Sequence, residues 1–203
     1  VLGGRCYERE AVPFKAFDGV VDALASYLAK LPGEQAGPLL PRAAALLGQV
    51  FPVLRRVKAI AGAPQPRAAA EVEPQEQRSR LFAALRELLG RLSDRTPLAL
   101  VVDDLHWADA DSLALLCEMV RPPEAPTLLL LATMRTDVPG GVTSEAVRNS
   151  LIGDVRTIGL GPLPAQEARA LAAALMARAA APVEALEARI ATEAQGHPLF
   201  IHE

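Results

Sequence analysis

Residues 98–109, which read Leu-Ala-Leu-Val-Val-Asp-Asp-Leu-His-Trp-Ala-Asp, constrain the fold of this chain more than any other segment. Five apolar residues in a row, bounded by Pro97 and Asp103, are typical of a strand buried inside a parallel sheet. Asp103 and Asp104 follow at the carboxyl end of that strand. Because open α/β sheets bind their ligands at this edge, the segment predicts both a fold class and the location of a site.

The segments around this strand alternate between helical and strand-like patterns. The strongest helix is expected over 75–92, where a leucine-rich stripe recurs at helical spacing. The predicted order continues with a helix over 112–120, a second buried strand over 128–133, a helix over 144–151 and a third strand over 155–160. This alternation is typical of β-α-β units and predicts a parallel sheet with flanking helices.

The N-terminal part predicts one short strand and several helices. The strand is expected over 1–6, and apolar residues at helical spacing predict a helix over 16–28. A further apolar stretch over 39–60 should split into two short helices at Pro41 and Pro52, because proline is tolerated at a helix start but not inside a helix.

The C-terminal part predicts a small helical domain. Helices are expected over 164–178 and 183–194, and they would form a lid. Upstream, the Pro- and Ala-rich segment over 62–74 is typical of a connector.

Composition places the chain among globular proteins and excludes some functions. With 203 residues, of which 51% are hydrophobic, it is long enough for one or two domains with an apolar core. The net charge is −3 and the 21 Lys and Arg residues are dispersed, which argues against a direct nucleic-acid surface. Cys6 and Cys117 lie in apolar neighbourhoods, which is typical of reduced thiols in a cytoplasmic protein. The apolar runs are too short to cross a membrane, so we expect no membrane contact.

Two adjacent carboxylates after an apolar strand suit a nucleotide-hydrolysing site. In P-loop NTPases this is the Walker B position, where the first acid helps to hold Mg²⁺ through water and the next polarises the attacking water. Successive strand residues face opposite ways, so two adjacent acids can take these two tasks. The prediction is that Asp103 is the metal-side residue and that Asp104 is the catalytic base.

Other interpretations of the same residues stay open at this stage. Asp103 or Asp104 could cap the following turn, as Asx residues often do. The two acids, together with His106 and Asp109, could instead supply the ligands of a metal hydrolase, although the chain has only three His residues. His106 and Trp107 could also form a packed turn that contacts no ligand.

A basic residue follows the next predicted strand. The run over 128–133 leads into Met-Arg-Thr-Asp, which places Arg135 at the carboxyl edge of the neighbouring strand. Taken alone, Arg135 would be interpreted as a solvated loop residue. Beside the acid pair it becomes a candidate sensor, a cationic group that detects the γ-phosphate or its departing charge.

Three segments together resemble the AAA-type ATPase domains of the STAND class of P-loop NTPases. They are Gly4–Glu10, which reads Gly-Arg-Cys-Tyr-Glu-Arg-Glu, the acidic run that ends at Asp109, and Gly196–Phe200, which reads Gly-His-Pro-Leu-Phe. The resemblance covers nearly the whole chain. It is to the origin-recognition-like ATPase domains of bacterial regulators, in which such a module follows a serine/threonine kinase or precedes a helical or DNA-binding output region.

The resemblance implies a set of roles for this chain. Members of the class bind ATP with Mg²⁺ and use binding or slow hydrolysis to switch a signalling output. Gly196, His197 and Pro198 match the Gly-x-Pro element of the helical lid that closes over the nucleotide base, so they are the expected cofactor-binding residues. They are equally compatible with a helix C-cap followed by a new helix start. The implied partners are ATP or ADP and other domains of the same protein, and homo-oligomerisation is left open.

One element of the family pattern is not in the sequence. A Walker A loop needs Gly-x-x-x-x-Gly-Lys-Ser/Thr, because backbone amides hold the phosphates and the lysine reaches them. The three lysines, Lys15, Lys30 and Lys58, follow Phe, Ala and Val, so none forms a Gly-Lys pair. In the family this loop and its strand would precede Val1. We therefore expect a piece of a larger protein that lacks the central strand beside the sensor strand and is inactive alone.

The sequence thus predicts an α/β fold of the additional-strand class of P-loop NTPases. Residues 1–161 are expected to form the nucleotide-binding core, and residues 162–203 the start of the helical lid. The predicted function is an ATP-binding and ATP-hydrolysing regulatory module of a multidomain bacterial signalling protein in the cytoplasm. The alternative is a non-catalytic protein-interaction module that keeps the NTPase fold.

Overall fold

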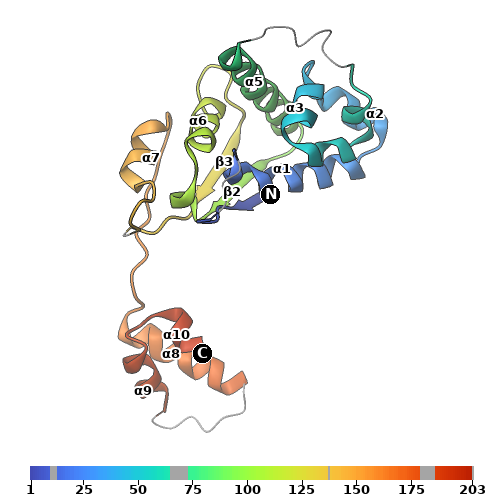
Figure 1. The fold of residues 1–203 in the computed structure, drawn as a ribbon. Helices are drawn as coiled ribbons and strands as arrows, with labels where there is room; N and C mark the ends of the chain where they lie inside the picture. The colour runs from blue at the N-terminus through green and yellow to red at the C-terminus, as the bar shows by residue number, and fades with distance from the viewer. Residues whose placement is uncertain (10–12, 65–72, 137, 179–185, 203) are drawn as a thin grey trace. The chain divides into compact units, whose positions relative to one another are not determined.

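The chain divides into two compact units, Val1–Val155 and Arg156–Glu203 (Figure 1). Each unit is described by itself below. The division falls a few residues before the predicted boundary between core and lid, and the functional meaning of that boundary stays a prediction. The computed structural model describes residues 1–9, 13–64, 73–136, 138–178 and 186–202.

A parallel sheet lies at the centre of the N-terminal unit. Within the described residues its strands are β1 (Leu2–Arg5), β2 (Leu98–Asp103) and β3 (Leu128–Ala132), hydrogen-bonded in the order β1-β2-β3. Both pairings are parallel, with Arg5 opposite Asp103 and Val102 opposite Ala132. The prediction of a parallel sheet is confirmed, and the carboxyl ends of the described strands meet at one edge.

Helices pack around this sheet, most of them close to where the sequence predicts them. They are α1 (Lys15–Lys30), α2 (Gly33–Ala36), α3 (Ala44–Val50), α4 (Lys58–Ala61), α5 (Pro74–Ser93), α6 (Ala110–Met119) and α7 (Ser144–Ser150), with the 3₁₀ turns η1 (Gly37–Leu39), η2 (Pro52–Arg56) and η3 (Leu105–Trp107). Helix α1 contacts β1 and β2, and α5 contacts α3 and α6. Pro52 begins η2, as expected for a proline that interrupts a helical stretch. Most of the predicted connector over 62–74 lies outside the described residues.

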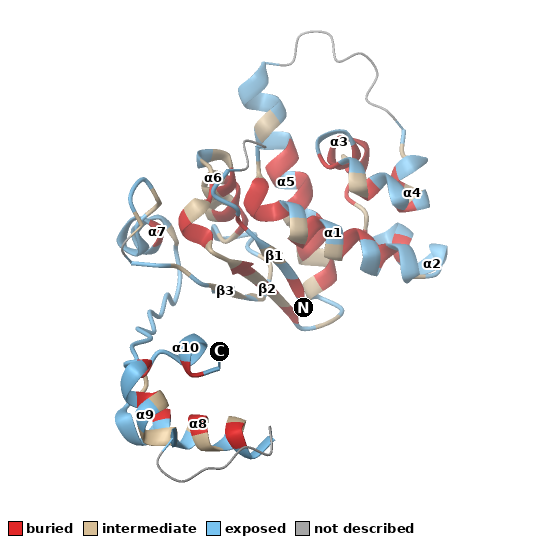
Figure 2. Ribbon diagram, turned by 60° about the horizontal axis from the view of Figure 1, so that its bottom comes forward, coloured by how far each residue is buried: buried red, intermediate tan, exposed pale blue. Residues whose placement is uncertain are grey.

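The sheet is well covered on one face only. In β2 the buried residues Leu98, Leu100 and Val102 alternate with partly buried ones. Strand β3 has no buried residue (Figure 2). Its residues Leu129 and Leu131 are 64% and 52% exposed. The prediction of a second buried strand is therefore wrong for β3. Its apolar run is an edge strand with one face uncovered in the described part of the chain.

The predicted third strand over 155–160 is also wrong. Residues 151–164 form neither helix nor strand, and Ile158 and Leu160 are 80% and 93% exposed. A strand exists only where a partner completes its ladder of backbone hydrogen bonds. The only neighbour of β3 in the described sheet is β2, so the described residues give this segment no partner.

The C-terminal unit is helical. It contains α8 (Ala165–Arg178), α9 (Leu186–Glu193) and α10 (Pro198–His202). The first two correspond to the predicted helices over 164–178 and 183–194, and residues 183–185 lie outside the described residues. The helices share a small apolar cluster made by Ala168, Ala172, Ala191, Ala194 and Ile201. The role of this unit as a lid stays a prediction.

Two expectations from composition concern membranes and thiols. None of the helices in the described ranges is long and apolar enough to cross a membrane. Cys6 is buried and Cys117 is partly exposed.

Helix α1 approaches β1 closely, and two glycines make this approach possible. A Cβ on Gly19 would come within 2.6 Å of the Gly4 Cα, and a Cβ on Gly4 within 3.0 Å of the Val20 nitrogen. Both obstacles are backbone atoms, which cannot rotate away as a flexible side chain could. The contact fixes α1 against the strand that ends in Arg5.

We predict that Gly19→Ala destabilises the N-terminal unit by about 1–3 kcal/mol, because the helix must move away from the strand. The matched control is Gly90→Ala in α5, where an added Cβ would meet no atom within 4 Å. That change should stabilise the protein by about 0.5–1 kcal/mol, since alanine is favoured over glycine in helices. Urea unfolding followed by circular dichroism measures both. Equal stability of the Gly19→Ala variant and the parent would contradict the close packing.

Candidate functional site

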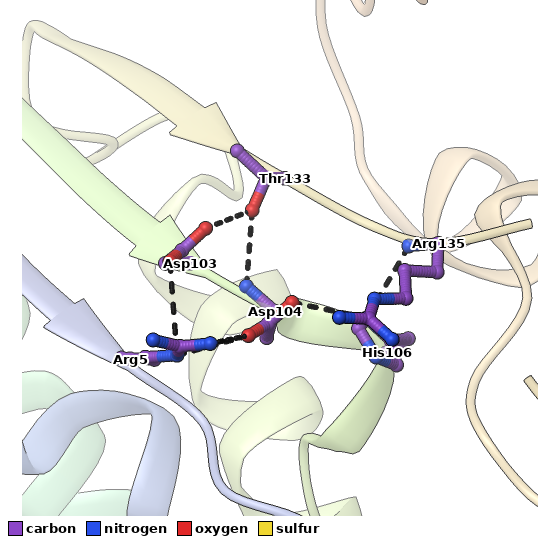
Figure 3. A network of polar contacts seen from close by, with 6 residues as sticks. All are labelled: Arg5, Asp103, Asp104, His106, Thr133 and Arg135. Atoms are coloured by element: carbon purple, nitrogen blue, oxygen red, sulfur yellow. Dashed lines mark hydrogen bonds and ion pairs between the residues drawn. The ribbon is translucent and has the colours of Figure 1, made fainter. Parts of the chain in front are cut away.

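The carboxyl edge of the sheet carries polar side chains from all three described strands (Figure 3). Arg5 ends β1, Asp103 ends β2, and Thr133 follows β3. The Thr133 N–H donates to the Val102 carbonyl oxygen at 3.0 Å, which continues the β2–β3 ladder by one residue. The parallel register thus gathers a cation, a carboxylate and a hydroxyl at one edge.

Asp103 is held from two sides and still faces solvent. The Thr133 hydroxyl donates to its Oδ1 atom, and the Arg5 Nε atom lies 3.8 Å from its Oδ2 atom. The Asp103 side chain is 48% exposed. A hydrated cation can therefore approach this carboxylate without any rearrangement of the sheet.

Asp104 leaves the strand direction and pairs with Arg5. Its φ of 55° lies in the left-handed region, which Asp and Asn tolerate better than most residues. Its N–H donates to the Thr133 hydroxyl oxygen at 3.0 Å, and its Oδ2 atom accepts from Arg5 Nε at 2.9 Å and Nη2 at 2.7 Å. The hydrogen bond to Asp104 and the charge of that carboxylate raise the pKa of Arg5. The two charges compensate each other in this structure.

Arg135 lies near the acid pair through its backbone. The His106 Nδ1 atom accepts a hydrogen bond from the Arg135 N–H at 3.3 Å and lies 4.0 Å from the Asp104 Oδ1 atom. The Arg135 residue itself is exposed. The structure therefore places Arg135 near Asp104 through His106, while the metal-side, base and sensor roles of Asp103, Asp104 and Arg135 stay predictions.

Sequence reasoning did not identify Arg5 or Thr133 as site residues. Arg5 lies 99 positions before the acid with which it pairs, and Thr133 lies 30 positions after Asp103. Their only signal in the sequence is that each stands at the end of a predicted strand. That signal becomes specific only when strand order and register are known.

Asp109 has a structural task at the start of α6. Its carboxylate accepts from the Ser112 N–H at 2.8 Å and the Ser112 hydroxyl at 2.6 Å, which caps the helix. It also accepts from the Lys15 N–H at 3.1 Å and the Phe14 N–H at 3.4 Å, at the start of α1. One carboxylate thus joins the N-termini of two helices, where negative charge is favourable.

The hydrogen bonds to Asp109 also determine its proton affinity. Burial alone would raise the pKa of this carboxyl, but the hydrogen bonds from Ser112, Lys15 and Phe14 outweigh burial and hold the pKa below its usual value. Asp109 is therefore a charged cap at neutral pH.

The described residues fit Mg²⁺ better than a protein-only metal centre. No group of three or more His, Cys, Asp or Glu side chains in this part of the chain gathers where it could hold a metal ion. The metal hydrolase alternative thus has no ligand cluster there, since Asp109 binds helix termini. Mg²⁺ keeps several waters and uses one or two carboxylates together with substrate phosphates, a demand that the exposed Asp103 can meet.

The predicted nucleotide-base element belongs to the C-terminal unit. Gly196 follows α9 with a φ of 74°, its N–H donates to the Ala191 carbonyl at 3.3 Å, and Pro198 begins α10. A Cβ on Gly196 would come within 2.4 Å of the Leu163 carbonyl oxygen, so glycine is required for backbone reasons alone. The His197 ring lies 4.8 Å from the Phe200 ring. Nucleotide binding by Gly196, His197 and Pro198 stays a prediction.

Comparison with known proteins gives one match that covers the acid pair. A family model described as an AAA ATPase domain matches residues 1–131. The match includes Arg5, Asp103 and Asp104 and ends before Thr133 and Arg135. No curated protein and no solved structure matches the chain significantly.

We predict that Asp109→Asn lowers the stability of the N-terminal unit by about 1–3 kcal/mol at pH 7, because an amide offers one acceptor oxygen where the carboxylate offers two. The folded-state pKa of Asp109 is lowered, so its charge stabilises the fold above the unfolded pKa of about 4 and loses this effect as the pH falls through the folded value. The difference between parent and variant should therefore shrink below about pH 4.

Urea unfolding at several pH values measures this difference. The control is Asp22→Asn, which removes an exposed ion pair with Arg56 at 3.5 Å and should change stability by less than about 1 kcal/mol. A stability difference that is the same at pH 7 and pH 2.5 would contradict the charged-cap assignment.

Proposed function

The chain belongs to the family of AAA ATPase domains, and on that premise we propose that it is the ATP-binding and ATP-hydrolysing regulatory module of a multidomain bacterial signalling protein. Members of this family generally bind ATP with Mg²⁺. The proposed module uses nucleotide binding, or slow hydrolysis, to switch the output of the protein in which it resides. The proposed setting is that of STAND-class regulators, in which such a domain is linked to a serine/threonine kinase or to a transcriptional output region.

The observation that carries this proposal is the acid pair at the carboxyl edge of the sheet. Asp103 is half exposed and steadied by the Thr133 hydroxyl, which suits a carboxylate that holds hydrated Mg²⁺. Asp104 is only 16% exposed in its side chain and stands one residue beyond the strand end, which suits a base that polarises a water molecule. The different environments of two adjacent acids support the two different roles.

The Arg5–Asp104 ion pair gives the proposed site a resting state. The Asp104 Oδ2 atom already accepts two hydrogen bonds from the Arg5 guanidinium, so in this arrangement it is not available to a water molecule. Arg5 is half exposed, so it can turn toward solvent or toward a phosphate without crossing the core. In the proposed mechanism Asp104 acts on water after Arg5 has released it.

The phosphate-binding part of the proposed site comes from a Walker A loop outside these residues. Strand β3 has an open edge in the described sheet, and its Leu129 and Leu131 side chains are largely exposed. The open edge supports a further strand beside β3, and the exposed face indicates that the described sheet is not complete, because parallel sheets usually bury both faces. We assign this place to the strand that feeds the Walker A loop.

Two further elements complete the proposed module. Arg135, which follows β3, would sense the γ-phosphate. Gly196, His197 and Pro198 would close over the nucleotide base as part of a helical lid. ATP, Mg²⁺ and the other domains of the same protein are the proposed partners.

A non-catalytic interaction module is the second candidate. It is favoured by two observations, namely that the chain has no Gly-Lys pair and that Asp104 is neutralised by Arg5. In that case the open edge and the exposed face of β3 would contact a protein partner.

Nucleotide binding separates the two candidates. A form of the protein that extends upstream of Val1 should contain Gly-x-x-x-x-Gly-Lys-Ser/Thr and should bind ATP in the presence of Mg²⁺ in a calorimetric titration. The chain of 203 residues should bind ATP far more weakly, because it lacks the amides and the lysine that hold the phosphates. An extended form that binds no nucleotide would favour the interaction module.

We predict that Asp104→Asn in such an extended form slows ATP turnover by roughly 10²- to 10⁴-fold, the range expected for the loss of a positioned base. The affinity for ATP should change little. Asn tolerates the left-handed backbone at this position as well as Asp does, so the substitution tests the charge and not the fold.

The matched control for this substitution is Asp111→Asn, which removes a carboxylate from the first turn of α6, where it pairs with Arg78 at 2.8 Å. It should leave turnover within about twofold of the parent, because a surface ion pair contributes little. Unchanged turnover in Asp104→Asn would remove Asp104 from the mechanism.

A further inference from the structure

His106 is a buried polar side chain to which the proposed function gives no task of its own. It lies in η3, two residues after Asp104, and is only 1% exposed. Its ring lies 5.0 Å from the Trp107 ring, so it is part of a packed turn. An imidazole ring is needed in a packed turn only if its nitrogens make a polar contact.

The two ring nitrogens have different surroundings. The Nδ1 atom accepts a hydrogen bond from the Arg135 N–H at 3.3 Å, so in the neutral ring the proton is on Nε2. The Nε2 atom is buried and has no hydrogen-bond partner among the described residues. Leaving a buried donor unpaired is unfavourable, and an apolar side chain would avoid that cost. The contact that distinguishes histidine from an apolar residue here is therefore the one to Arg135.

The backbone of His106 makes a second contact with the segment that connects β3 to α7. Its carbonyl oxygen accepts from the Val142 N–H at 2.8 Å. A Cβ on Gly141 would come within 3.0 Å of that oxygen, so the loop lies close against the turn. Residue 106 thus contacts the segment that follows β3 near its beginning and near its end.

The hydrogen bonds of the β2–β3 ladder end at Thr133, so the backbone after Thr133 needs another contact to fix its position. The Thr133 N–H and carbonyl groups bond to Val102 and Leu105, and these bonds extend the β2–β3 ladder. At Arg135 the anchor is the side chain of His106. The Nδ1 atom of the imidazole ring thus lies 3.3 Å from the Arg135 nitrogen and 4.0 Å from the Asp104 Oδ1 atom, and it connects the Arg135 backbone to the acid pair.

We propose that His106 is a positioning residue, whose Nδ1 atom fixes the backbone of Arg135 beside Asp104 and so determines where the Arg135 side chain begins. The inference that the position of the Arg135 side chain affects ATP turnover rests on the proposed function. The hydrogen bond itself is a property of this chain and can be tested without nucleotide.

Three substitutions distinguish the effect of each ring nitrogen from the effect of side-chain packing. His106→Asn keeps an acceptor oxygen near the place of Nδ1, whereas His106→Gln carries its amide near the place of Nε2. His106→Leu keeps a similar volume and has no acceptor. The readout is amide hydrogen exchange of Arg135 by NMR, with the Thr133 amide as internal control, since that amide bonds to Val102.

The Leu and Gln variants should exchange the Arg135 amide about fivefold faster than the parent, the effect of losing one ordinary hydrogen bond. The Asn variant should stay close to the parent, and Thr133 should be unchanged in all three. Unchanged exchange of Arg135 in the Leu variant would overturn the proposal. Equal acceleration at Thr133 would also overturn it, because the ring would then act only through general packing.

Turnover provides the functional test. In the extended, ATP-hydrolysing form, His106→Leu should lower kcat by about 10- to 100-fold with little change in KM, because a displaced sensor affects the transition state more than ATP binding. His106→Asn should restore most of the activity. If the extended parent neither binds nor hydrolyses ATP, the proposed function fails, whereas the amide exchange still decides whether His106 positions Arg135.

Discussion

The parallel pairing of β2 with one strand on each side is the constraint on which the rest of this structure depends. Because the described strands run in the same direction, their carboxyl ends meet at one edge of the sheet. Arg5 and Asp104 lie 99 positions apart in the sequence and are hydrogen-bonded there. Asp103 and Thr133 lie 30 positions apart and are hydrogen-bonded as well. The glycine contact between α1 and β1 holds one outer strand in place, and the ladder continued by Thr133 holds the other. The site is therefore a consequence of strand direction and register.

Three acids that lie within seven positions of one another have three different environments. Asp103 faces solvent and accepts from a hydroxyl, Asp104 is paired with a guanidinium, and Asp109 caps one helix while accepting from the start of another. Chemically identical side chains thus differ in charge compensation and in access to water. Under the proposed function, these differences separate a metal-side carboxylate, a base that must be released, and a structural cap. Composition and motif treat the three as equivalent, and hydrogen-bond partners distinguish them.

Prediction from the sequence succeeded where structure is decided locally. The leucine stripe of α5 and the five apolar residues of β2 carry their own periodicity and boundaries, so both elements were predicted within a residue or two. Prediction failed for residues 155–160, which have the composition of a strand but form no strand in the described structure. It also failed for the burial of β3, whose four leucines read as core but lie on an edge strand. In both cases the outcome depends on a partner elsewhere in the chain, and a local window of sequence does not contain that partner.

The sequence by itself determined that this chain forms a parallel α/β sheet with an acid pair at its carboxyl edge, because apolar runs, helical stripes and a strand that ends in two acids are local patterns. It also determined that no Gly-Lys pair is available to hold phosphates. Only the tertiary structure decided that Arg5 compensates Asp104, that Thr133 bonds to Asp103 and that His106 holds the Arg135 backbone. The physical reason is that each of these contacts joins residues from different elements, and their distances are set by register and packing. Asp109 illustrates both sides of this division, since its place before α6 is local, whereas its bonds to the start of α1 exist only in the fold.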